Sequence, residues 1–169
     1  MIQVNKLSIT QIQEDRPLIK DLSFIVNPGE RIALIGEEGN GKSTLLKYLL
    51  GLPLPGFATE WNKSLDTPAG YLEQDLRSRW GETNVLDYFL LDAPEGMIED
   101  YALLGKIPAF LEKEHFPKGS FSPEKTIAEF SGGEIVRLAL AKLKLRPYRS
   151  FLLDEPSNDF DLESLSLLK

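Results

Sequence analysis

Apolar residues alternate with polar ones along the first part of the chain, at the period of two that is typical of β-strands. The alternation predicts an edge strand over residues 2–9 and a second strand over residues 22–26, with a turn at residues 14–17 between them. Asn27-Pro28-Gly29-Glu30 predicts another turn. The next run, Arg31-Ile32-Ala33-Leu34-Ile35, is continuously apolar after its first residue, as a buried parallel strand is. The apolar residues of the first two strands are Ile2, Val4, Leu7, Ile9, Leu22, Phe24 and Val26.

Helical patterns take over in the middle of the chain. Residues 44–50 predict a helix that Gly51 ends, because glycine accepts the left-handed conformation at a helix C-terminus. Residues 57–69 are poorly patterned and are expected to be strand or loop, whereas residues 70–74 predict a short strand. From residue 75 to about 130 the sequence predicts mainly helix. Expectations within that segment are an N-cap at Thr83, helical spacing from Met97 to Leu104, and a short helix from Pro108 to Phe116.

An α/β pattern returns after residue 130. A helix is expected to begin at Ser131-Gly132-Gly133-Glu134 and to end at Arg146-Pro147, with Ile135, Leu138, Ala139 and Leu143 on its apolar face. Phe151-Leu152-Leu153 predicts a second buried strand, and Asp161 is expected to cap a last helix. We therefore expect one α/β domain over residues 1–169, with a core of residues 1–74 and 131–169 and an inserted helical subdomain at about 75–130.

Length and charge are those of one ordinary globular domain. The 169 residues suffice to bury a core, and the formal charge of −7 argues against a broad surface for nucleic acid or anionic membrane. The chain has no cysteine, which excludes disulfides and thiolate metal sites. It shows neither the apolar core of a signal peptide nor the roughly 18 apolar residues of a membrane span. A cytoplasmic protein without direct membrane insertion is expected.

The strongest chemical signal is Gly36-Glu37-Glu38-Gly39-Asn40-Gly41-Lys42-Ser43-Thr44, which fits the phosphate-binding loop G-x-x-x-x-G-K-[ST] between a predicted strand and a predicted helix. Its glycines let backbone N–H groups face phosphates, and Asn40 and Thr44 complete the predicted nucleotide-binding loop. Lys42 is expected to reach the β- and γ-phosphates, and the Ser43 hydroxyl to ligate Mg²⁺. A glycine-rich turn before an ordinary helix is the alternative. The loop alone does not distinguish kinases, GTPases and motor-like ATPases.

Two further segments fit the same chemistry. Asp154 and Glu155 follow an apolar strand, where one carboxylate can hold the water shell of a metal and the next can polarise an attacking water. A solvated turn is the alternative for this pair. Ser131-Gly132-Gly133 at a helix start is a second anion-binding element, for which a plain N-cap with two glycines is the alternative.

Taken in order, these motifs resemble those of the ATP-binding cassette (ABC) ATPases. The resembling segments are residues 36–43 as Walker A, Gln74 as the Q-loop glutamine, residues 130–134 as the signature usually written LSGGQ, residues 151–155 as Walker B, and residues 157–161 as the D-loop. The resemblance implies a P-loop NTPase fold of the ABC type: a mixed or parallel sheet core, an antiparallel N-terminal β part and an inserted α-helical subdomain.

The resemblance also implies ligands and roles. ATP and Mg²⁺ are the expected ligands, with Ser43, Gln74 and Asp154 around the metal. Glu155 is implied as the general base, with Lys42 and Gln74 also catalytic. Residues 131–133 are implied to contact the γ-phosphate bound by a second cassette, from the same chain or a second copy, in a head-to-tail pair.

The residues around the motifs most resemble subfamily F. Phe-Ser-Gly-Gly-Glu at 130–134, Arg-Leu-Ala-Leu-Ala-Lys at 137–142 and Leu-Asp-Glu-Pro-Ser-Asn-Asp-Phe-Asp-Leu-Glu-Ser at 153–164 carry this resemblance. Members of subfamily F have two cassettes in one chain, no membrane domain, and act on ribosomes, so a ribosome-associated ATPase is expected. The alternatives are the ATPase subunit of a membrane transporter, with a transmembrane partner subunit, and a nucleotide-binding fragment that does not hydrolyse ATP.

The chain departs from the family pattern in several places, among them Phe in place of Leu at positions 130 and 160. No aromatic residue precedes Phe24, so the usual adenine-stacking residue is missing and Ile12 is the expected apolar substitute. Asp159 stands where subfamily F usually has histidine, and His115 lies too early to be the switch histidine. The chain stops at Lys169, before the central strand and the switch histidine that follow the D-loop in this family. We therefore expect weak or absent hydrolysis and marginal stability of a truncated cassette.

Overall fold

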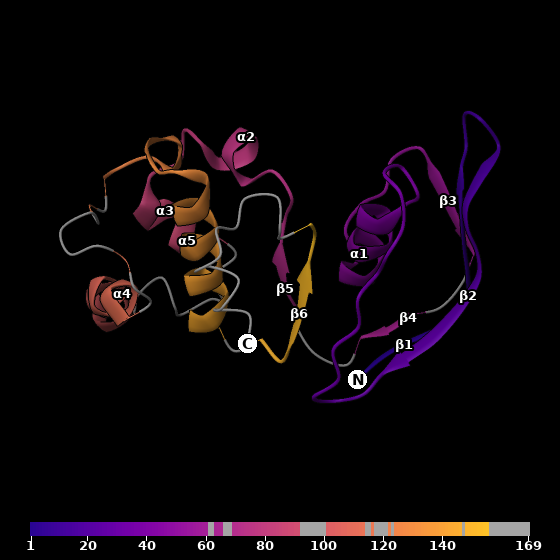
Figure 1. The fold of residues 1–169 in the computed structure, drawn as a ribbon, viewed down its shortest axis with the longest axis horizontal. Helices are drawn as coiled ribbons and strands as arrows, with labels where there is room; N and C mark the ends of the chain where they lie inside the picture. Colours follow the sequence, from indigo (N-terminus) through magenta and orange to yellow (C-terminus); the bar gives the residue numbers. More distant parts are fainter. Residues whose placement is uncertain are drawn as a thin grey trace. The chain divides into compact units, whose positions relative to one another are not determined.

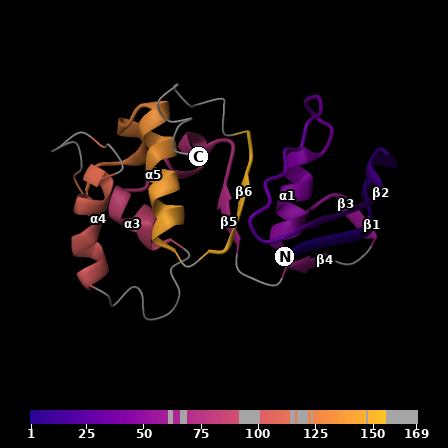
Figure 2. The ribbon, with the colours of Figure 1, turned by 60° about the horizontal axis from the view of Figure 1, so that its bottom comes forward.

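The computed structural model describes residues 1–60, 63–65, 69–91, 101–113, 116, 122, 124–146 and 148–155. The chain divides into two compact units (Figure 1). Unit 1 comprises residues 1–71 and 148–154, and unit 2 comprises residues 72–147 and 155–169. Strands dominate unit 1 and helices dominate unit 2 (Figures 1 and 2).

The main sheet of unit 1 is built around its first strand. β1 (Ile2–Gln11) pairs antiparallel with β2 (Arg16–Val26), and it also pairs antiparallel with β3 (Phe57–Glu60) and β4 (Lys63–Leu65). The two expected N-terminal strands are confirmed, but the prediction that the first lies at a sheet edge is wrong, since the strand order is β2-β1-β3. The alternation of apolar and polar residues in β1 indicates that one face is buried, but it does not indicate how many strands pair with β1. Residues 57–69, which contain the partners β3 and β4, have too weak a pattern to predict these strands.

Bulges let β1 and β2 keep one apolar face. β1 holds one residue more than β2 between Val4 and Leu7. Lys6 lies there with a φ of 51°, and its N–H donates to Ser23 Oγ at 2.7 Å. Because side chains alternate along a strand, the extra residue brings Leu7 to the same face as Val4. Between the pairs Leu7–Leu22 and Ile9–Ile19 the extra residue lies in β2 instead, and Asp21 there has a φ of 50°.

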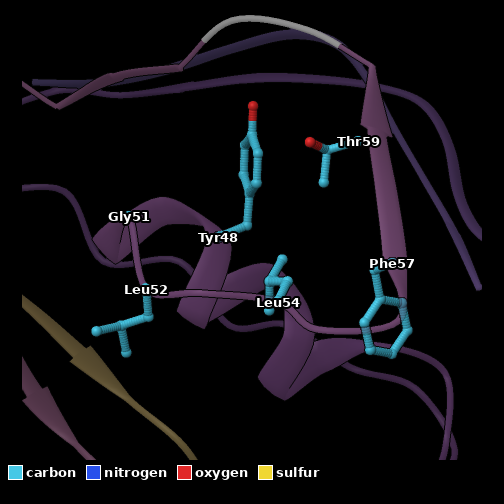
Figure 3. Close-up of a pocket in the computed structure, with 6 residues that line it drawn as sticks. All are labelled: Tyr48, Gly51, Leu52, Leu54, Phe57 and Thr59. Carbon is cyan, nitrogen blue, oxygen red and sulfur yellow. The ribbon is translucent and has the colours of Figure 1, made fainter.

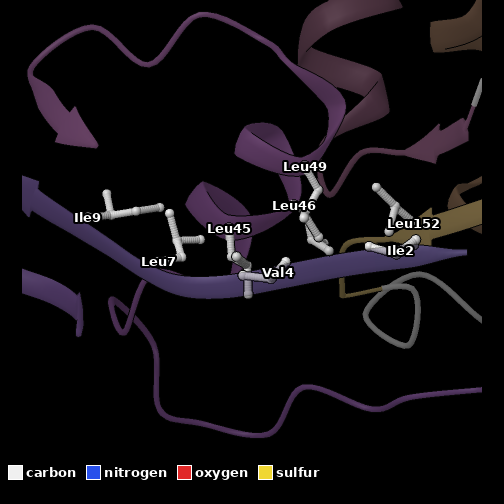
Figure 4. Close-up of a cluster of buried hydrophobic side chains, with 8 residues drawn as sticks. All are labelled: Ile2, Val4, Leu7, Ile9, Leu45, Leu46, Leu49 and Leu152. Carbon is white, nitrogen blue, oxygen red and sulfur yellow. The ribbon is translucent and has the colours of Figure 1, made fainter. Parts of the chain in front are cut away.

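Helix α1 (Lys42–Leu50) packs on β1 through its leucines (Figures 2 and 4). The expected C-terminus is confirmed, because Gly51 has a φ of 76° and its N–H donates to the Tyr48 carbonyl oxygen at 3.0 Å. The core cluster of unit 1 consists of Ile2, Val4, Leu7, Ile9, Leu45, Leu46, Leu49 and Leu152.

A second, two-stranded sheet is formed by β5 (Ala69–Leu72) and β6 (Ser150–Leu153), both of which were expected. Leu152 of β6 belongs to the core of unit 1, whereas the neighbouring Phe151 is 48% exposed. β6 therefore buries one face only, so the strand was predicted correctly but the prediction that it is buried is wrong. β6 ends directly before Asp154, so the sheet fixes the backbone from which this carboxylate projects.

The apolar run 31–35 is not a strand in the structure, so the prediction of a buried parallel strand is wrong. Ile32, Leu34 and Ile35 are 53%, 42% and 96% exposed. A strand persists only where a ladder satisfies its N–H and C=O groups. Among the described residues no strand pairs with this run, because β6 pairs with β5 and the other strands pair with β1.

Unit 2 is organised around its longest helix, α5 (Gly132–Leu145). The expected apolar face is confirmed, since Ile135, Leu138, Ala139 and Leu143 are all buried. Helices α2 (Leu76–Trp80) and α4 (Tyr101–Lys113) pack against α5. α3 (Val85–Leu90) and the 3₁₀ turn η1 (Ile127–Glu129) are the other helical elements of the described part of unit 2.

The C-terminal end of α5 is tied to the C-terminal end of α3. Arg146, where α5 was expected to end, is 7% exposed. Its Nη2 donates to the carbonyl oxygens of Phe89 at 2.5 Å and Leu91 at 3.1 Å. Phe89 lies in the last turn of α3 and Leu91 is its C-cap, where helix geometry leaves carbonyl acceptors without an intrahelical donor. The guanidinium therefore caps one helix from the end of another.

Some helix boundaries differ from the sequence prediction. The N-cap of α3 is Asn84 and not Thr83, because Asn84 Oδ1 accepts the Asp87 N–H at 2.8 Å. The Thr83 carbonyl oxygen instead accepts the Ile127 N–H at 3.0 Å. Pro108 lies inside α4 and does not start a separate helix. Met97 and the helix expected from Asp161 lie outside the described residues. In the part of the chain that the structure describes, no helix is long and apolar enough to cross a membrane.

Candidate nucleotide-binding site

The predicted phosphate-binding loop leads directly into α1. Gly39 and Gly41 have φ values of 78° and 82°, a left-handed conformation that glycine adopts without strain. Gly41 is the N-cap of α1, so the loop ends at the positive end of the helix dipole. Lys42 Nζ donates to the carbonyl oxygens of Gly36 and Glu37, both at 2.9 Å. The ammonium group therefore lies against the start of the loop.

The loop leaves room and donors for an anion. Residues 36–40 are exposed, and a Cβ placed on Gly39 would meet no atom within 4 Å. Among the described residues, the N–H groups of Gly39 and Gly41 have no hydrogen-bond partner, whereas the Asn40 N–H donates to the Glu37 carbonyl oxygen at 3.4 Å. Thr44 is half-buried in the first turn of α1. Unpaired donors beside an ammonium group at a helix N-terminus fit the phosphates of a nucleotide.

Asp154 joins three elements of unit 1. The carboxylate is 3% exposed, and each oxygen accepts a hydrogen bond. Ser43 Oγ, from the first turn of α1, donates to Oδ1 at 2.9 Å, and Tyr71 Oη, from β5, donates to Oδ2 at 3.0 Å. The structure thus brings together Ser43 and Asp154, which are 111 positions apart. A hydroxyl and a carboxylate in contact are hard oxygen donors that fit Mg²⁺.

Gln74 and Glu155 form a second pair, in unit 2. Gln74 Nε2 donates to Glu155 Oε2 at 2.9 Å. Glu155 has a φ of 46°, and the left-handed conformation costs a residue other than glycine about 1–2 kcal/mol. Backbone strain therefore coincides with the residue expected to be the general base, as is common where the backbone must aim a functional group.

Ser131 and Glu134 cap α5 reciprocally. The Ser131 N–H and hydroxyl both donate to Glu134 Oε2 at 2.8 Å, and Ser131 Oγ accepts the Glu134 N–H at 3.3 Å. Burial raises the pKa of the Glu134 carboxyl, but the bonds from Ser131 and the charges of Lys125 and Arg137 outweigh burial and lower that pKa. Gly132 and Gly133 occupy the first turn and are half-buried. The local bonds of this segment are those of an N-cap.

Tyr71 is the functional candidate that sequence reasoning missed. It was predicted only as part of a short strand, and the available signal was its place at the end of a strand that leads to Gln74. Ile12, the expected substitute for an adenine-stacking residue, is 61% exposed in the turn between β1 and β2. His115 and Asp159 lie outside the described residues.

A cavity of about 340 Å³ lies in another part of unit 1, between the C-terminal end of α1 and β3 (Figure 3). None of the predicted site residues lines it. Its lining residues are Tyr48, Gly51, Leu52, Leu54, Phe57 and Thr59.

Known proteins with similar sequences show the family to which this chain belongs. The model of the ABC transporter family matches residues 19–158. The ATP-binding protein Uup of Escherichia coli is 36% identical over 156 residues, which are 91% of this chain and 24% of Uup. The energy-dependent translational throttle protein EttA of Haemophilus influenzae is 34% identical over 170 residues, which are 96% of this chain and 28% of EttA. Both relatives belong to subfamily F, and the chain spans about a quarter of their length.

Solved structures bear on the fold. One is of a protein assigned to the metal-chelate type of ABC transporter in an inward-facing conformation. It matches with a TM-score of 0.70 and 24% identity, over 99% of this chain and 66% of that one. A protein from Pyrococcus furiosus, assigned as an ABC transporter ATP-binding protein, has a TM-score of 0.64 and 22% identity over 99% and 82% of the two chains. The α/β fold class of an ABC ATPase domain is thereby confirmed. Since the family model covers most of the chain and the subfamily F relatives match 91% and 96% of it, this chain belongs to the ABC family of ATP-binding proteins, with its resemblance to subfamily F confirmed.

Proposed function

We propose that this chain is a cassette of the subfamily F type that binds ATP with Mg²⁺ and hydrolyses it in a head-to-tail pair with a second cassette. The observation that carries this proposal is the 2.9 Å hydrogen bond between Ser43 and Asp154, which unites Walker A and Walker B in one oxygen-rich site. ATP binding is a property of the family. Hydrolysis by this chain and the pairing of cassettes belong to the proposal.

The role of each residue follows from its chemistry. Lys42 and the N–H groups of the loop bind the phosphates, while Ser43 and Asp154 would hold the metal. For Gln74, the resemblance to ABC ATPases implies a place in the metal shell. Bound Mg²⁺ supplies positive charge that neutralises the phosphate oxygens. Glu155 accepts the proton of the attacking water, and the hydrogen bond from Gln74 orients its carboxylate. Ser131 donates to the γ-phosphate of the partner cassette, for which its hydroxyl must leave Glu134.

Binding and turnover by the full chain test this function. A fluorescent ATP analogue is expected to bind more tightly with Mg²⁺ than in EDTA, and Lys42→Ala is expected to weaken binding by more than about tenfold. Lys47→Ala is the matched control, because Lys47 is an exposed lysine in the last turn of the same helix. Glu155→Gln is expected to keep binding and to lower turnover by about 100-fold or more. Equal loss of ATP with wild type and Glu155→Gln would show a nucleotide-binding fragment that does not hydrolyse ATP.

We further propose association with ribosomes, supported by the likeness to Uup and EttA. Co-sedimentation of Glu155→Gln with ribosomes in the presence of ATP is the expected outcome, since blocked hydrolysis holds a cassette in its ATP-bound state. Co-purification with membranes, without ribosomes, would instead support the ATPase subunit of a transporter.

A further inference from the structure

We propose that Tyr71 is a positioning residue for Mg²⁺: its hydroxyl holds the Asp154 carboxylate in the orientation that metal binding needs. The proposal rests on the function proposed above. The Tyr71 hydroxyl donates to Asp154 Oδ2 at 3.0 Å, while Oδ1 accepts from Ser43 at 2.9 Å. The two oxygens are thus bound by different donors from different elements.

The Asp154 carboxylate depends on the hydrogen bonds from Ser43 and Tyr71 because it is buried. Asp154 is 3% exposed, and a buried ionised carboxylate is stable only where hydrogen bonds replace its water. Ser43 is itself expected to bind the metal, so its hydrogen bond does not serve Asp154 alone. The Tyr71 hydroxyl donates to the oxygen that Ser43 does not contact. Tyr71 is therefore the donor that can support Asp154 whether or not Ser43 binds Mg²⁺.

The fold makes Tyr71 a stiff support. Tyr71 lies in β5, and β5 pairs with β6, which ends directly before Asp154. A tyrosine side chain has two main torsions, so a ring fixed at its backbone places its hydroxyl with little freedom. Outer partners that orient a metal-ligating group typically change metal affinity by about 10- to 100-fold when they are removed.

The alternative is a tyrosine that merely satisfies a buried carboxylate, and Tyr71→Phe separates the two because it removes only the hydroxyl. The readout is equilibrium binding of a fluorescent ATP analogue by the full chain, titrated with Mg²⁺ and repeated in EDTA. We expect the half-saturating Mg²⁺ concentration to rise about tenfold in Tyr71→Phe. Binding in EDTA is expected to stay within about twofold, because the phosphate contacts of the loop do not involve Tyr71.

Control variants are measured in the same Mg²⁺ titration. Tyr48→Phe makes the same change at another tyrosine of unit 1, one that lines the cavity of Figure 3, and is expected to behave as wild type. Asp154→Asn is expected to abolish the Mg²⁺ dependence. 4-Aminophenylalanine at position 71 keeps a donor in place of the hydroxyl and is expected to restore the wild-type titration to within about threefold. Thermal melting in EDTA establishes that each variant folds, and O-methyltyrosine replaces phenylalanine as the donor-free ring if Tyr71→Phe does not fold.

The outcomes are distinct. A folded donor-free variant with the wild-type Mg²⁺ titration, together with loss in Asp154→Asn, would overturn the role of Tyr71 and leave the proposed function standing. Wild-type chain that binds no ATP, or binds it equally with Mg²⁺ and EDTA, would overturn the proposed function and the role of Tyr71 with it. A selective rise in the half-saturating Mg²⁺ concentration supports both.

Discussion

Replacing Ser131 by alanine removes the hydroxyl that accepts the Glu134 N–H and donates to Glu134 Oε2. Only the bond from the Ser131 N–H then remains of the capping box. Loss of an N-cap of this kind costs about 1 kcal/mol. The cost falls on the first turn of α5, which leads into the buried face through Ile135 and Val136. We therefore expect the opening of this turn to become easier by about 1 kcal/mol, which is roughly a fivefold change in its equilibrium constant.

Hydrogen exchange followed by mass spectrometry measures this change locally. Peptides from the first turn of α5 are expected to exchange roughly fivefold faster in Ser131→Ala, while peptides from its last turn change less. Ser122→Ala, at an exposed serine, is the control. Unchanged exchange in the first turn of α5 would refute the capping geometry, and the signature segment would then have only its implied role at the nucleotide.

The carboxylate of Glu134 is also expected to make the stability of the folded chain depend on pH in the acid range. The pKa of Glu134 is lowered in the folded chain, although burial acts in the opposite direction. A lowered pKa contributes stability that is present above the unfolded value, near 4.5, and is lost as the pH falls through the folded value. Glu134→Gln is therefore expected to melt with a shallower pH dependence below pH 4.5 than wild type. If the melting temperatures of wild type and Glu134→Gln fall equally with pH in that range, the lowered pKa of Glu134 in the folded chain is contradicted.

The remaining predictions concern packing. Leu7→Ala empties a fully buried position and is expected to lower the free energy of unfolding by about 3 kcal/mol in urea, whereas Ile12→Ala, at a residue 61% exposed, is expected to change it by less than about 0.5 kcal/mol. A loss below about 1 kcal/mol for Leu7→Ala would contradict the core of unit 1. Gly81→Ala places a Cβ 2.6 Å from the Arg77 carbonyl oxygen and is expected to destabilise unit 2 by about 2 kcal/mol. Gly105→Ala, in α4 where an added Cβ would meet no atom within 4 Å, is expected to stabilise unit 2 by about 0.5–1 kcal/mol. A raised melting temperature for Gly81→Ala would contradict the crowded environment of Gly81, and a lowered one for Gly105→Ala would contradict the open environment of Gly105.

Sequence reasoning succeeded where a local pattern determines the element. The helix start at Ser131, the apolar face of α5 and its end at Arg146 all lie within one segment, and the structure reproduces them. The N-cap predicted at Thr83 is wrong, because the neighbouring Asn84 is the more favourable N-cap residue and accepts the Asp87 N–H. Boundaries of this kind depend on a single side-chain rotamer.

Sequence reasoning failed where an outcome depends on distant residues. The run 31–35 has the composition of a buried strand, yet whether it becomes one depends on ladder partners elsewhere in the chain. The contact of Tyr71 with Asp154 joins positions 83 apart, and no spacing rule announces it. The Ser43–Asp154 contact was anticipated because the motifs carry a known chemistry, and not because their separation indicated it.

The bulges of the β1–β2 hairpin define where this part of the chain can change length. Val4 pairs with Phe24 and Ile9 with Ile19, so the extra residue in β1 and the extra residue in β2 offset each other between these pairs. In these two bulges the N–H has a serine acceptor on the opposite strand, Ser23 for Lys6 and Ser8 for Asp21. Loss of a bulge residue would leave the flanking pairs intact and deprive one serine of its partner. Across related sequences, a gap at Lys6 should therefore covary with the residue aligned to Ser23, and a gap at Asp21 with the residue aligned to Ser8.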